Sequence, residues 1–157
     1  MEAHLDIRGR TAIPTVVGGA AYGVLVPPIL LLAAVLAAER VSFVLVGSAA
    51  LWLQGEDVPV ADVDAVPEPG PANLARLHAA LLTLAVRDRI VPRPRSLQLL
   101  DIVTAPTSYG RLDCLLERGR RDWDRLRRGA GVIRVTDADV LVASVADAWS
   151  LRRAFKG

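Results

Sequence analysis

The segment "VADVDAV" (residues 60–66) places two aspartates one residue apart within an otherwise apolar run. Alternation with a period of two is typical of a β-strand, because successive side chains of a strand point to opposite faces of the sheet. The pattern predicts a strand that has Asp62 and Asp64 on one face and small apolar residues on the other. Aspartate is uncommon in strands, and two neighbouring carboxylates repel each other unless a positive charge lies between them.

Two interpretations of this acidic pair are open. The aspartates could be solvent-facing residues of an edge strand, or they could bind a divalent cation such as Mg²⁺, which prefers carboxylate oxygens. Asp113, in the apolar segment "GRLDCLL", is a third candidate ligand, with Leu112 and Cys114 expected on the buried face of the strand. Asp113 could instead pair with an arginine such as Arg111.

A possible anion site lies upstream, where the apolar run "SFVLVG" (42–47) is followed by "SAALWLQ" (48–54). We predict a buried strand that leads directly into a short helix. Backbone N–H groups at the start of the helix would then face an anion, and Gly47 would allow its close approach. Ser48 could also act only as the helix N-cap.

The remaining elements alternate along the chain, which indicates an α/β sandwich with a mixed sheet and helices packed on it. We expect a single domain over residues 1–157, with an N-terminal extension (1–27) and a core (28–157). The other predicted elements are helix 28–40, a helix from an Asn73 N-cap to about Val86, strands 97–104 and 110–117 joined by a hairpin-like turn, helix 121–130, short strands near 132–135 and 140–143, and helix 145–155.

An uncharged run of 28 residues, from Thr11 to Ala38, is long enough to span a bilayer. Because Pro27 and Pro28 divide it into two halves that are each too short to span alone, we favour a buried N-terminal segment over a membrane anchor. The single cysteine, Cys114, excludes a disulfide framework, which fits a reducing, cytoplasmic location.

Charge is distributed unevenly along the chain. Residues 1–70 hold three basic and eight acidic side chains, whereas residues 71–157 hold sixteen basic and nine acidic ones. The basic half could face a polyanion such as RNA, but interspersed aspartates and few aromatic residues suit a solvated basic face equally well. The candidate phosphate-binding arginines are Arg87, Arg89, Arg93, Arg95, Arg118, Arg120, Arg121, Arg125, Arg127 and Arg128.

With these residues assembled, the chain resembles the DNA polymerase beta-like nucleotidyltransferase superfamily. The shared pattern is a strand, Gly47-Ser48, a short helix, Asp62-Val63-Asp64 and a later strand aspartate, Asp113. The chain is most similar to small bacterial AbiEii-like and minimal nucleotidyltransferases, which include toxins of toxin–antitoxin pairs. Four ordered blocks between about residues 30 and 155 carry this likeness: "FVLVGSAAL", "DVDAVPEPGPANLARLHAAL", "TSYGRLDCLL" and "VLVASVADAWSLRRA".

The resemblance implies transfer of a nucleoside monophosphate from a nucleoside triphosphate such as ATP to an acceptor hydroxyl. Two Mg²⁺ ions would be bound by Asp62, Asp64 and Asp113. Gly47 and Ser48 would hold the triphosphate, together with Arg152 or Arg153. The implied acceptor is RNA, with tRNA the first expectation, or a protein such as a partner antitoxin.

The chain departs from the family pattern at two places. Many relatives carry polar residues just before the first aspartate, where this chain has "VPVA" (58–61), and many continue beyond the final helix. An alternative is therefore a catalytically degenerate module that binds a nucleotide or a partner.

Overall fold

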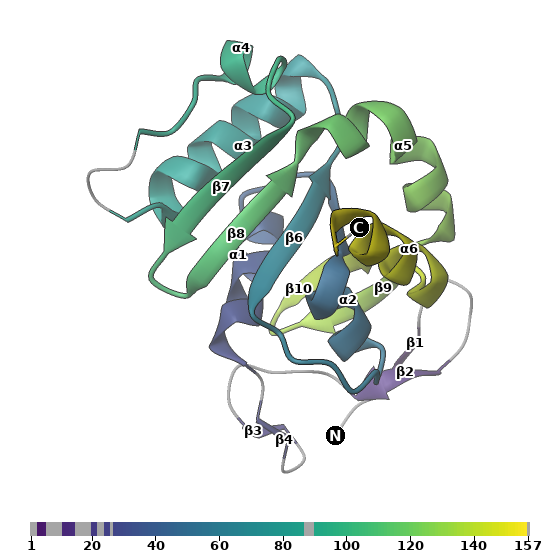
Figure 1. Ribbon diagram of the computed structural model, residues 1–157. Coiled ribbons are helices and arrows are strands. Elements are labelled where there is room, and N and C mark those ends of the chain that lie inside the picture. The colour runs from purple at the N-terminus through teal and green to yellow at the C-terminus, as the bar shows by residue number, and fades with distance from the viewer. Residues whose placement is uncertain are drawn as a thin grey trace.

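The computed structural model describes residues 3–5, 11–14, 20–21, 24–25, 27–86 and 90–156, with side chains for residues 27–86 and 90–151. A six-stranded mixed sheet forms its centre, in the order β7-β8-β6-β5-β10-β9 (Figure 1). The prediction of a mixed α/β fold is thus confirmed. The strands are β5 (Phe43–Val46), β6 (Asp62–Pro67), β7 (Ile102–Thr107), β8 (Gly110–Leu115), β9 (Gly131–Val135) and β10 (Ala138–Val142).

Helices cover both faces of this sheet (Figure 1). In that view α2 and α6 lie in front of the strands, whereas α1 and α3 lie behind them. The helical segments are η1 (Pro28–Leu30), α1 (Leu31–Ala38), α2 (Gly47–Leu53), α3 (Pro71–Leu84), α4 (Pro94–Leu97), α5 (Leu116–Gly129) and α6 (Val145–Lys156). Outside the sheet, β1 (Ala3–Leu5) pairs with β2 (Thr11–Pro14), and β3 (Ala20–Ala21) pairs with β4 (Val24–Leu25).

The second half of the uncharged N-terminal run belongs to the hydrophobic core. Leu30, Leu32 and Leu36 are fully buried, since η1 and α1 pack against the sheet. Within the described ranges, no helix is both long and apolar enough to cross a bilayer. The expected burial of residues 11–26 concerns side chains that lie outside the described part of the chain.

Several predicted boundaries move. α4 occupies Pro94–Leu97, so the strand predicted from Leu97 begins only at Ile102. Pro94 stands at the start of that short helix, a position where proline is well tolerated. The helix predicted from Arg121 begins at Leu116, directly after β8. The predicted hairpin is confirmed, because β7 and β8 are antiparallel and joined at Thr107 and Gly110.

The predicted N-cap role of Asn73 is wrong. α3 begins at Pro71 with Gly70 as its N-cap, because proline suits the first turn of a helix. Asn73 is instead buried within α3, where its side chain contacts the backbone of two other segments. Its Nδ2 donates to the carbonyl oxygens of Ser42 (2.9 Å) and Glu68 (2.8 Å), and its Oδ1 accepts from the Ser42 N–H (2.7 Å). Asn73 therefore ties the start of β5 to the end of β6.

Replacing Asn73 with alanine is expected to lower the free energy of unfolding by about 2–4 kcal/mol, because buried backbone groups lose their partners. Chemical denaturation of the variant measures this change. Thr83→Ala, in the same helix, is the control: Thr83 is exposed and bonds only to the Ala79 carbonyl of its own helix. An Asn73→Ala variant as stable as this control would contradict the role assigned to the side chain.

Candidate functional site

Parallel pairing of β6 with β8 brings four charged residues side by side. In the register, Asp62 lies opposite Arg111 and Asp64 lies opposite Asp113. Residues two apart in a strand share a face, so the four side chains form a square of three carboxylates and one guanidinium. Because β6 lies between β8 and β5 in the sheet, the alternative of an acidic pair on an edge strand is wrong.

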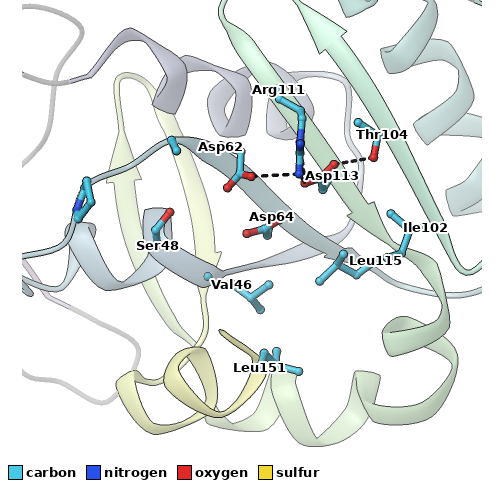
Figure 2. A pocket seen from close by; sticks show the side chains of 13 residues that line it. Val46, Ser48, Asp62, Asp64, Ile102, Thr104, Arg111, Asp113, Leu115 and Leu151 are labelled. Carbon is cyan, nitrogen blue, oxygen red and sulfur yellow. Dashed lines mark hydrogen bonds and ion pairs between the residues drawn. The ribbon is translucent and has the colours of Figure 1, made fainter. Parts of the chain in front are cut away.

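The square borders a pocket of about 590 Å³. Gly47 and Ser48, at the start of α2, also line this pocket, and Leu151 of α6 contributes an apolar wall (Figure 2). The structure therefore brings Gly47, Ser48, Asp62, Asp64 and Asp113 together at one cavity, as the sequence pattern predicts. Their roles there remain predictions.

The three carboxylates are close enough to share one cation. An oxygen from each of Asp62, Asp64 and Asp113 lies within 4.8 Å of the others. Asp113 is buried, with 6% of its surface exposed, and the other two are half-buried. Three hard oxygen donors at this spacing fit a divalent cation such as Mg²⁺, which takes its remaining ligands from water or phosphate.

Arg111 also contacts the cluster. Its Nε and Nη2 donate to Asp113 Oδ2 at 3.1 and 2.9 Å, and Nη2 lies 3.3 Å from Asp62 Oδ2 (Figure 2). The pairing of Asp113 with Arg111, left open by the sequence, is thus present. The hydrogen bond to Asp113, with that residue's charge, raises the pKa of Arg111 above its ordinary value, so the guanidinium stays charged.

The surroundings of Asp64 shift the pKa of its carboxyl group strongly. Burial raises the pKa of Asp64 from its ordinary 3.8 to about 7, and the charges of Asp62 and Asp113 add to the rise. The positive charge of Arg111 opposes this rise without cancelling it. The cluster therefore holds more negative charge than Arg111 balances, which fits a site for an additional cation.

Thr104 is a site residue that the sequence pattern did not single out. It lies opposite Asp113 in the β7–β8 pairing, and its Oγ1 donates to Asp113 Oδ1 at 2.7 Å. One oxygen of Asp113 is thus held by Thr104 and the other by Arg111. β7 contains two threonines, Thr104 and Thr107, and only the pairing register identifies the one that reaches the carboxylate.

Gly47 is required by the position of Asp64. Its φ is +68°, in the left-handed region that favours glycine. A Cβ atom there would lie 3.2 Å from Asp64 Cγ and closer still to its carboxylate oxygen. The alternative role of Ser48 as N-cap is wrong, because Val46 is the cap residue of α2 and no side chain bonds at that cap.

Comparison with known proteins supports the architecture. No family model and no curated protein matches the sequence significantly. Among solved structures, the chain is similar to a "putative nucleotidyltransferase" from Thermotoga maritima, with a TM-score of 0.54 and 15% sequence identity. The similarity covers 80% of this chain and 81% of that one. This chain has a nucleotidyltransferase fold. At this level of identity the likeness concerns the fold.

The arginines predicted to bind phosphate include some whose side chains the structure does not describe and several on α5. Arg152 and Arg153 follow Leu151 in α6, but their side chains lie outside the described residues, as do Arg87 and Arg89. Several arginines of α5 contact nearby acids. Arg118 pairs with Asp122, Arg121 with Glu117, and Arg125 with Asp147, while Arg120 lies 3.5 Å from Asp101. Each of these four arginines therefore lies near an acidic side chain of the same chain, and RNA binding by α5 stays a prediction.

Proposed function

We propose that the protein is a Mg²⁺-dependent nucleotidyltransferase, which moves a nucleoside monophosphate from a nucleoside triphosphate to an acceptor hydroxyl. The observation that carries this proposal is the meeting of Asp62, Asp64 and Asp113 on adjacent strands, at a pocket of the nucleotidyltransferase fold. As part of the same proposal, the protein is of the AbiEii-like or minimal nucleotidyltransferase type and acts as a toxin of a toxin–antitoxin pair.

The three aspartates would hold two Mg²⁺ ions, which when bound neutralise phosphate charge and favour attack by a hydroxyl. The chain itself supplies the arrangement of the ligands. Thr104 holds one oxygen of Asp113, so the carboxylate cannot rotate freely. Gly47, having no side chain, leaves Asp64 its place beside α2. The backbone of Gly47 and the hydroxyl of Ser48, which line the pocket, would contact the triphosphate, with Arg152 or Arg153 as further candidates.

For the acceptor we propose RNA, with tRNA as the first substrate to test. The sequence pI of about 9.2 and the basic second half of the chain support a polyanionic acceptor. The paired arginines of α5 give this choice little support, so a protein hydroxyl, such as that of a partner antitoxin, stays as the alternative acceptor.

A specific observation also favours a second candidate function. Arg111 already provides a positive charge to Asp62 and Asp113, which partly replaces a metal ion there and so favours a module that binds a nucleotide or partner without catalysis. The two candidates differ in turnover. The binding module should bind a nucleoside triphosphate without releasing pyrophosphate.

One experiment distinguishes the RNA-modifying enzyme, the protein-modifying enzyme and the binding module. The protein is incubated with each α-³²P-labelled nucleoside triphosphate and Mg²⁺, in the presence of total RNA or of lysate protein. We expect label on RNA, none with EDTA, and none with an Asp62→Asn variant. Label on protein would select the alternative acceptor. Absence of transfer to either acceptor, with triphosphate binding detected by calorimetry, would reject the enzyme and support the binding module.

A further inference from the structure

Arg111 is an unusual neighbour for three candidate metal ligands. It lies on the same strand and the same face as Asp113, two residues away, and opposite Asp62 on the adjacent strand. Both its Nε and Nη2 bond to one oxygen of Asp113, and Nη2 also reaches Asp62. The guanidinium therefore uses two of the three carboxylates that would bind the cation.

Simultaneous binding of Arg111 and a divalent cation at these oxygens is unfavourable. Asp113 Oδ1 accepts from Thr104 and Oδ2 accepts twice from Arg111, so both oxygens are already engaged. A positive charge within a few ångströms of a divalent cation also repels it, and the repulsion is strong where water is partly excluded. Arg111 can leave the cluster at little steric cost, because 57% of its side chain is exposed.

We infer that Arg111 is a built-in counter-ion of the carboxylate cluster that competes with the divalent cation for Asp62 and Asp113. The inference rests on the metal-binding part of the proposed function and adds how the affinity for metal is set. In the metal-free protein Arg111 offsets part of the repulsion among the carboxylates. Metal binding displaces the guanidinium from the cluster toward solvent, so the affinity measured for the metal is lowered by the cost of breaking these contacts.

The test is calorimetric titration of the full chain with Mn²⁺ and with Mg²⁺, without nucleotide. Arg111→Gln removes the competing charge and is expected to bind Mn²⁺ about tenfold more tightly than wild type. Arg111→Lys keeps the charge but cannot make the two hydrogen bonds of the guanidinium to Asp113, so an intermediate gain in Mn²⁺ affinity of about threefold is expected. Arg76→Gln is the control, since Arg76 is exposed on α3, behind the sheet, and its replacement changes the net charge equally (Figure 1).

The outcomes separate this inference from the proposed function. If wild type and both Arg111 variants bind Mn²⁺ with equal affinity, or if the variants bind it more weakly, Arg111 does not compete with the metal. The inference then fails, while the proposed function is unaffected. If none of the proteins binds either metal, the inference and the proposed metal dependence both fail. Tighter binding by the Arg111 variants without any nucleotidyl transfer would uphold the inference and reject the enzyme. Should Arg111→Gln not fold, as judged by circular dichroism, Arg111→Lys alone decides.

Discussion

Replacing Asp64 with asparagine should reduce nucleotidyl transfer by at least about 10³-fold while making the metal-free protein more stable. Transfer is lost because asparagine supplies a neutral and weaker ligand in place of a carboxylate. Stability is gained because burial and two neighbouring carboxylates disfavour the charge of Asp64. Opposite changes of activity and stability at one residue are expected where a fold holds like charges together for function.

The gain in stability should depend on pH. In the folded chain the pKa of Asp64 is about 7, against an ordinary 3.8, so the folded state holds this proton more tightly than the unfolded state. The contribution of Asp64 to the free energy of unfolding therefore falls as pH rises from about 4 to 7, and it stays constant above that range. Relative to wild type, Asp64→Asn should gain little at pH 4 and about 2–4 kcal/mol at pH 8.

Chemical denaturation of both proteins in EDTA at pH 4, 6 and 8 measures this difference, and the labelled transfer assay measures activity. Asp57→Asn is the matched control, because it makes the same change in charge at an exposed loop position and should alter neither property. An Asp64→Asn variant that keeps a tenth of wild-type transfer would remove Asp64 from the proposed metal ligands. A pH-independent difference in stability would contradict the raised pKa.

Gly47→Ala is expected to destabilise the protein by about 2–4 kcal/mol and to reduce transfer at least about a hundredfold. The positive φ of Gly47 accounts for part of the destabilisation, because a Cβ atom is disfavoured in that region. The rest comes from contact with Asp64, whose backbone is fixed by β-pairing on both sides. The Asp64 side chain must then move, which displaces its carboxylate from the cluster.

Gly55→Ala separates the two causes. Gly55 also has a positive φ, of +89°, but apart from its own chain neighbours no residue has an atom within 4 Å of the position that its Cβ would take. It should therefore show the backbone cost alone, with unchanged transfer. In an Asp64→Ala background the carboxylate is gone and only the Cβ at position 64, 3.3 Å away, remains near the added methyl group, so Gly47→Ala should then cost little more than Gly55→Ala. Equal effects of the two glycine substitutions in the wild-type background would show that contact with Asp64 is not the cause.

Elements whose local pattern agrees with their burial were predictable from the sequence. The alternation of Asp62, Val63 and Asp64 places charged and buried side chains on opposite faces, and β6 follows that pattern. Leu74, Leu77, Leu81 and Leu84 recur at the i, i+3, i+4 spacing of a helix, and all four lie on the buried side of α3. Asn73 was misassigned because asparagine is common at N-caps, whereas its hydrogen bonds here are made to residues distant in sequence or beyond the helix start.

The candidate site, like the fold, was predictable from the sequence only in part. The sequence by itself singled out Gly47, Asp62, Asp64 and Asp113 as candidate site residues, because acids within apolar strands and a glycine at a strand–helix junction are costly unless a site requires them. Only the tertiary structure decided how they meet. The parallel register of β6 and β8 sets Asp64 against Asp113 and places Arg111 against Asp62, while the β7 pairing adds Thr104. Register depends on contacts between strands that lie far apart in the sequence, and a shift of one residue would turn these side chains to the opposite face.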